Sequence, residues 1–196
     1  MRQLSCKALV VGVGVLGILV GHAAAARAQA APAHPAGHEG MKSDHAMMMP
    51  KDDASYVQMM QMHHQMGIDM AKIAVDKSSR EDVKAFARKM IDAQQKEIEE
   101  LRRMQSSLKG NAAMHDDHEP MMKGEMDKMM ADLRQAQGAA FDDKFIDMMI
   151  PHHQQAIAMS KPQTKFKSAE VQEFANKIVA AQTAEVKELQ QMRKKR

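Results

Sequence analysis

The chain has 196 residues, including 22 methionines, ten histidines, one cysteine and no tryptophan, and its 28 basic residues stand against 25 acidic ones. One cysteine excludes an intramolecular disulfide, and with 3% aromatic residues, methionine has to supply much of any core. Three basic residues and no acidic ones lie in residues 1–30, so the rest of the chain is balanced in charge and lacks the basic excess that nucleic-acid binding requires.

Residues 1–30 have the three parts of a secretory signal peptide. Arg2 and Lys7 form a positive start, residues 8–20 are an apolar run, and residues 28–30 read Ala-Gln-Ala, the small-x-small pattern for cleavage. The apolar run of about 13 residues is shorter than the roughly 20 that span a bilayer. We therefore expect cleavage near Ala30 and a periplasmic or secreted protein with no membrane anchor after cleavage.

Residues 31–54 show no helical period, and we expect a disordered tail rich in histidine and methionine. Residues 110–138 are similar in composition, and their later half, from 119 to 137, favours an additional helix. Both segments supply auxiliary candidates for metal binding: His34, His38, His45, Met47, Met48, Met49, His115, His118, Met121 and Met122.

The rest of the chain contains an internal repeat. Residues 59–72 read MMQMHHQMGIDMAK, and residues 148–161 read MMIPHHQQAIAMSK. The following segments also match, with VKAFARKMIDAQQKEIEELRRM at 83–104 and VQEFANKIVAAQTAEVKELQQM at 171–192. Each copy has the apolar period of a hairpin of two helices, and one hairpin cannot bury its apolar stripe alone.

Two such copies predict an all-α four-helix bundle over residues 55–196. Its parts are repeat one at residues 55–109, a long crossover at 110–138 and repeat two at 139–196. Ser78 with Glu81 fits a capping box that would start the second helix. Pro151 removes one backbone donor, so we expect it to kink the third helix or to start a new one.

Methionine and histidine recur one helical turn apart in both copies. At 100° per residue, a methionine and a histidine four positions later share one face of a helix. Each copy has two such columns side by side, and further methionines extend one of them. The candidate metal ligands are Met59, Met60, His63, His64, Met66 and Met70 in the first copy and Met148, Met149, His152, His153 and Met159 in the second.

The donor types in these columns select for copper. Thioether sulfur is a soft neutral ligand that suits Cu(I) and its mimic Ag(I), and imidazole accepts both Cu(I) and Cu(II). Hard cations such as Mg²⁺ and Ca²⁺ need oxygen cages, which the columns do not provide. The alternative is that the methionines are only core residues, but the paired histidines need a polar partner or a metal. We predict copper binding, with Cu(I) favoured over Cu(II).

Polar residues interrupt the apolar stripes of the second and fourth helices. These are Gln94 and Glu97 in repeat one and Gln182 and Glu185 in repeat two. They either accept a hydrogen bond from the ring N–H of a ligating histidine, which fixes its tautomer, or join neighbouring helices as buried polar pairs.

The pattern M-M-x-x-H-H-Q-x-x-I-x-M, followed by F-A…Q…E-[IV]…L…M, resembles the domain-of-unknown-function family numbered 305. The resemblance covers residues 55–195, and MIPHHQQAIAM at 149–159 is its most specific part. It implies a ferritin-like four-helix fold and a periplasmic copper metallochaperone or buffer that contributes to copper tolerance. The repeated methionine and histidine motifs would be the ligands.

Other functions stand beside this one. A di-iron or di-manganese oxidase would need Glu-x-x-His motifs, and none occurs in the chain. A cuprous oxidase is an alternative, as is a methionine-rich module that binds apolar peptides or helices without metal. We favour a non-enzymatic role, in which the tail samples copper and delivers it to the bundle, for transfer to a copper-transport or copper-oxidising partner.

Overall fold

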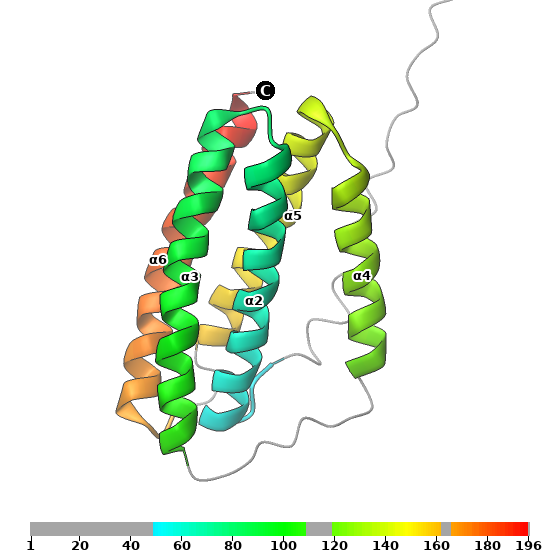
Figure 1. Cartoon of the computed structure of the whole chain (residues 1–196). Helices are drawn as coiled ribbons and strands as arrows, with labels where there is room; N and C mark the ends of the chain where they lie inside the picture. Colours follow the sequence, from blue (N-terminus) through cyan, green and yellow to red (C-terminus); the bar gives the residue numbers. More distant parts are fainter. Residues whose placement is uncertain (1–48, 109–118, 162–165, 196) are drawn as a thin grey trace, which may run out of the picture. The chain divides into compact units, whose positions relative to one another are not determined.

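The structure is a computed structural model that describes residues 49–108, 119–161 and 166–195. Every regular element in these ranges is an α-helix (Figure 1). The helices are α2 (Asp53–Lys77), α3 (Glu81–Ser107), α4 (Glu119–Gln135), α5 (Gly138–Ser160) and α6 (Ala169–Lys194). The predicted signal peptide, most of the predicted tail and the candidate ligands His34, His38, His45, Met47, Met48, His115 and His118 lie outside the described residues.

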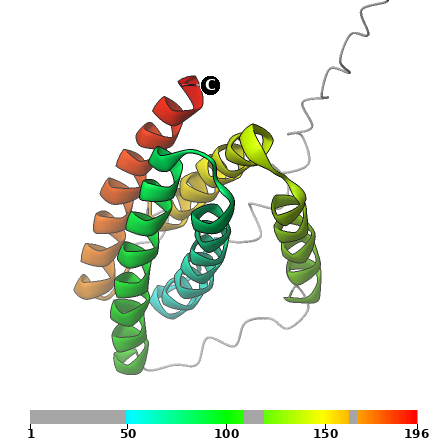
Figure 2. The ribbon, with the colours of Figure 1, turned by 45° about the horizontal axis from the view of Figure 1, so that its top comes forward.

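Four of the helices form the predicted bundle. α2 packs on α3 and α5 packs on α6, so each repeat is one helical hairpin, and contacts of α2 with α5 and of α3 with α6 join the hairpins. α4 contacts α2 and α5 and lies beside the bundle, as the turned view shows (Figure 2). The all-α fold made of two repeated hairpins is confirmed. None of the helices in the described ranges is long and apolar enough to cross a membrane.

The boundaries of the helices differ in detail from the predictions. α2 begins at Asp53, because Asp52 and Ser55 form a capping box in which Asp52 Oδ1 accepts the Ser55 N–H at 2.8 Å. The predicted capping box at Ser78 is wrong, since Ser78 ends α2 and α3 starts at Glu81 without a side-chain cap. α5 runs unbroken through Pro151, so no new helix starts there.

A buried carboxylate from each repeat holds the turn of the other hairpin. Asp53 accepts hydrogen bonds from the backbone N–H groups of residues 167 and 168, at 3.0 and 2.7 Å, just before α6. Asp142, near the start of α5, accepts from the hydroxyl groups of Ser78 and Ser79 in the turn before α3. Asp53 and Asp142 are separated by the repeat offset of 89 residues. These two contacts, the reciprocal clamps, therefore tie each repeat to the other.

The same two-fold relation recurs on the surface between α3 and α6. Lys89 pairs with Glu188 at 3.2 Å, and the equivalent residues Lys177 and Glu100 pair at 2.7 Å. Partly exposed pairs of this kind contribute little stability, so their value here is as evidence that the two copies share one geometry.

We expect Asp53→Asn to lower the free energy of unfolding by about 1–3 kcal/mol, because it weakens two charge-assisted hydrogen bonds to backbone donors. Urea denaturation followed by circular dichroism measures the change. The matched control is Asp69→Asn, whose half-exposed carboxylate contacts Lys72 and Gln65 at the surface, and whose loss should cost less than about 0.5 kcal/mol. Equal effects of the two substitutions would mean that the clamp contributes no stability.

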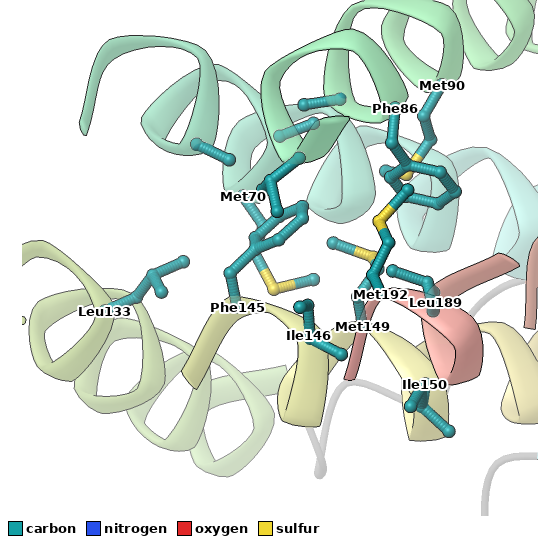
Figure 3. Packing of buried hydrophobic residues seen from close by; sticks show 14 of the residues in the cluster. Met70, Phe86, Met90, Leu133, Phe145, Ile146, Met149, Ile150, Leu189 and Met192 are labelled. Carbon is teal, nitrogen blue, oxygen red and sulfur yellow. The ribbon is translucent and has the colours of Figure 1, made fainter. Parts of the chain in front are cut away.

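The core of the bundle consists of two apolar clusters with a layer of polar side chains between them. The first cluster includes Met70, Phe86, Met90, Phe145, Met149, Leu189 and Met192 (Figure 3). The second includes Tyr56, Met60, Leu101, Met104, Ala156, Met159, Phe174 and Ile178. Between them along the helices lie eight buried residues that form the polar layer: His63 and His64 on α2, Gln94 and Glu97 on α3, His152 and His153 on α5, and Gln182 and Glu185 on α6.

Candidate metal centre

His63 of α2 and His152 of α5 stack face to face in the polar layer. Their ring centroids lie 3.8 Å apart with 12° between the ring planes, and the residues are 5% and 6% exposed. Because the two histidines are repeat equivalents, the stack lies where the two copies meet. Within the described structure, both ring nitrogens of His63 and Nε2 of His152 have no hydrogen-bond partner.

Burial keeps both of these rings neutral. Desolvation lowers the pKa of His63 to about 3, and repulsion from the His64 and His153 imidazoles adds to the shift. Desolvation likewise lowers the pKa of His152 well below its usual value, and repulsion from the neighbouring imidazoles acts in the same direction. Neutral imidazole is the form that binds a metal ion. Since each unpaired buried polar group costs about 1–3 kcal/mol, a coordinated ion would relieve a cost present in the metal-free protein.

The other two histidines are held by carboxylates. His153 Nδ1 lies 3.0 Å from the carbonyl oxygen of Met149, and its Nε2 lies 2.9 Å from Glu185 Oε2, so both ring nitrogens are engaged. His64 Nε2 lies 3.0 Å from Glu97 Oε2, an ion-pair distance, although the orientation does not meet hydrogen-bond geometry. His64 Nδ1 has no hydrogen-bond partner among the described residues. The polar layer thus contains the two stacked histidines, which have unpaired nitrogens, and two histidines that contact a carboxylate of their own repeat, of which only His153 has both ring nitrogens engaged.

The four residues predicted to support a ligating histidine fall into two groups, the two glutamates and the two glutamines. Glu97 contacts the ring of His64, and Glu185 contacts the ring of His153. Neither glutamate contacts a ring of the stacked pair. Gln94 and Gln182 are each 1% exposed, and both amide atoms of Gln94 and Oε1 of Gln182 lack a partner among the described residues. The two glutamines therefore add unsatisfied polar atoms to the same layer as the stacked rings.

Comparisons with known proteins identify the family. Residues 20–105 and 53–193 match the family described as Domain of unknown function (DUF305). The chain belongs to this family. No curated protein matches it. The family predicted from the repeated motif is therefore confirmed.

Solved structures of DUF305 relatives share the fold. CopM in the Cu(I)-bound form is 31% identical, with a TM-score of 0.57 over 74% of this chain and 96% of that chain. CopM in the Ag-bound form obtained by soaking is 31% identical, with a TM-score of 0.61 over 75% and 98% of the two chains. A DUF305 fragment from Deinococcus radiodurans is 23% identical and has the same fold, with a TM-score of 0.64 over 76% of this chain and 99% of the fragment.

In this DUF305 protein most of the candidate methionine ligands of the two repeats lie in or against the apolar clusters on either side of the polar layer. Met70 and Met149 belong to the first cluster with Met148 at its margin, Met60 and Met159 belong to the second with Met59 and Met49 at its margin, and Met66 is half-buried. Met121 and Met122 belong to α4. The described residues contain no group of three or more histidine, cysteine or acidic side chains that could hold a metal ion. A site in the bundle therefore needs thioether or amide groups beside the histidines.

Three positions that contribute to the site or to its support were not predicted. Asp53 and Asp142 keep the same offset as the repeated histidines, so extending the alignment toward the N-terminus of each copy would have found them. Gly67 is a glycine inside a helix where the second copy has Ala156, and this difference between the copies was the available signal.

Proposed function

We propose that this DUF305 protein is an exported copper-binding protein that captures, buffers or hands over copper and thereby contributes to copper tolerance. The observation that carries the proposal is the stacked pair of His63 and His152, which is buried and has unpaired ring nitrogens. Methionines of both apolar clusters lie within one or two helical turns of these rings and offer thioether ligands. The solved Cu(I)-bound, Cu(II)-bound and Ag-bound forms of CopM support copper as the ion.

Cu(I) is the favoured cargo, because neutral thioether and imidazole groups form a soft to borderline donor set. A methionine site suits an oxidising compartment, since a thioether is not lost to disulfide formation. Export rests on the signal-peptide pattern of residues 1–30. Mass spectrometry of the protein recovered outside the cytoplasm tests it, and a chain that still carries residues 1–30 would contradict export with cleavage.

Anaerobic titration with Cu(I) against a chromophoric chelator tests copper binding directly. We expect the purified protein without residues 1–30 to bind Cu(I) with a Kd below about 1 μM. Weaker binding would overturn the copper proposal and leave the methionine-rich interaction module. Oxygen consumption by the Cu(I)-loaded protein separates the two metal functions, because a binding protein should not turn over whereas a cuprous oxidase would.

The histidine-rich and methionine-rich tail is proposed to accelerate capture. We expect deletion of residues 31–48 to slow Cu(I) uptake several-fold and to lower the stoichiometry, while the affinity of the bundle stays the same. The deletion stops before Met49, because Met49 packs against the second cluster and Asp52 caps α2. Stopped-flow transfer from the chelator measures the rate, and urea denaturation confirms that the bundle is intact. Unchanged rate and stoichiometry would remove the tail from the mechanism.

A further inference from the structure

Gly67 lies buried in the middle of α2 at the level of the polar layer. The equivalent residue of the second repeat is Ala156, which is fully buried. A glycine inside a helix is less favourable than alanine, because it loses more backbone entropy on folding. The first copy therefore carries a cost that the second copy avoids, and the surroundings of Gly67 explain the difference.

Side chains from two other helices close over the backbone of Gly67. A β-carbon at this position would lie 2.6 Å from Gln94 Oε1, 2.9 Å from His152 Nε2 and 3.0 Å from the terminal methyl carbon of Met90. The first two distances are shorter than real contacts of a β-carbon. The absence of a side chain at residue 67 thus allows an amide oxygen, an imidazole nitrogen and a thioether group to converge on one place.

The polar atoms that converge there do not satisfy one another. Gln94 Oε1 and Nε2 and His152 Nε2 are buried and lack hydrogen-bond partners in the described part of the chain. Gln94 comes from repeat one and His152 from repeat two, so the place is built by both copies. Buried polar groups of native proteins are normally paired, and two unpaired groups facing the same place indicate a species that both can contact.

We propose that the cradle formed by Gly67, Met90, Gln94 and His152 binds one Cu(I) ion that the two repeats share. This inference deepens the proposed copper function and rests on it. His152 Nε2 and the Met90 sulfur, which is bonded to the methyl carbon that faces Gly67, would be the donors, a pair of the imidazole and thioether type that suits Cu(I). The Gln94 carbonyl oxygen faces the ion with its negative end. His63, stacked on His152, keeps that ring in place.

The two repeats differ at this position, so the cradle forms at Gly67 and not at its equivalent, Ala156. In the second copy the methyl group of Ala156 occupies the position that is open at Gly67. Within the described residues this open position therefore occurs once, on the side where the ring of repeat two reaches across to the backbone of repeat one. This asymmetry provides a matched pair of substitutions, Gly67→Ala and Ala156→Gly, that change no donor atom.

The test follows individual side chains by NMR during anaerobic Cu(I) titration of the ¹⁵N-labelled protein without residues 1–30. Long-range correlations report the ring nitrogens of His152, and the side-chain amide signals report Gln94. In the unsubstituted protein and in Ala156→Gly, both should shift at the same copper equivalent. In Gly67→Ala, the added methyl group displaces Gln94 and His152, and the affinity of this equivalent should fall by about 10–100-fold, the size of effect typical for groups that position ligands.

Met90→Leu provides the second variant, because it keeps an apolar side chain of similar size and removes the sulfur. It should fold normally and bind this copper equivalent at least about tenfold more weakly. Gly67→Ala protein that binds with unchanged affinity and unchanged shifts of Gln94 and His152 would overturn the cradle. If only His63 responded to Cu(I), the cradle would fail and the copper function would stand. If no histidine of the bundle responded but Cu(I) still bound tightly, the cradle would fail and the copper would belong to the methionines. If Cu(I) did not bind tightly at all, both proposals would fail.

Discussion

Replacing His63 and His152 together by leucine is expected to abolish copper binding in the bundle without unfolding it. The two rings are neutral and buried, and three of their nitrogens are unpaired among the described residues, so removing them discards no hydrogen bond on those atoms. Replacing unsatisfied polar groups by apolar ones of similar shape is close to neutral or stabilising. The metal-free variant should therefore match or exceed the stability of the unsubstituted protein at pH 7.

The copper affinity of this double variant, unlike its stability, should fall. Changes to groups that only support a ligand cost about 10–100-fold in metal affinity, so losing the His152 donor together with the ring stacked on it should cost more than about 100-fold. Competition titration with Cu(I) in the chain without residues 31–48 measures this loss without a contribution from the tail. A double variant with unchanged affinity would assign the copper to the methionines alone and remove the stacked histidines from the site.

His153→Leu is the matched control for the double substitution. It removes an equally buried histidine but leaves the Glu185 carboxylate without its partner. Breaking a buried pair on one side typically costs about 3–5 kcal/mol, so this variant should be clearly destabilised in urea. The copper affinity of its folded fraction should stay close to that of the unsubstituted protein. The double substitution should thus lower copper affinity without lowering stability, whereas His153→Leu should lower stability without lowering copper affinity.

Acidification is expected to destabilise the copper-free protein through His63. The pKa of His63 in the folded state, about 3, lies below the usual value of 6.5. Below pH 6.5, His63 therefore binds a proton in the unfolded chain but stays neutral in the folded protein. Stability from this residue is therefore complete above pH 6.5 and is lost as the pH falls toward 3. Between pH 7 and pH 5 the loss amounts to about 2 kcal/mol, and His152 adds to it in the same direction.

Urea denaturation at several pH values measures this dependence. His63→Leu should show a shallower fall in the free energy of unfolding between pH 7 and pH 5, because the substituted side chain does not titrate. Identical slopes for the two proteins would contradict the assignment of the pH dependence to His63. The folded protein should keep its copper affinity better on acidification than an exposed histidine site does, because the buried ring stays neutral over this range.

The helical hairpins could be predicted because the repeat gives two independent readings of one pattern. Apolar positions that recur in both copies mark the buried stripes. The same comparison singled out Glu97 and Glu185 with two possible roles, and the structure places them against His64 and His153. Helix ends were harder to predict, since they depend on single contacts. Ser78 has the residue type of a cap for α3, but it ends α2 and its hydroxyl group donates to Asp142 from the other repeat.

The choice between the paired histidines could not be made from the sequence. Adjacent residues on a helix differ by 100° in direction, and both His63 and His64 border the apolar stripe. Only the position of the neighbouring helices decides that His64 reaches Glu97 on α3 while His63 reaches His152 on α5. The role of Gly67 could not be predicted from the sequence either. It depends on the side chains of Gln94 and His152, which lie 27 and 85 positions further along the chain.

The reciprocal clamps have a consequence for how such a protein could be assembled. Each carboxylate, at Asp53 and Asp142, finds its partners in the hairpin to which it does not belong. A single hairpin would leave its carboxylate and its own turn without partners, whereas two copies of one hairpin, related by a dyad, would satisfy both at once. The duplicated chain thus has the internal geometry of a symmetric homodimer whose subunits were joined end to end. The linker between the halves removes the concentration dependence of their association.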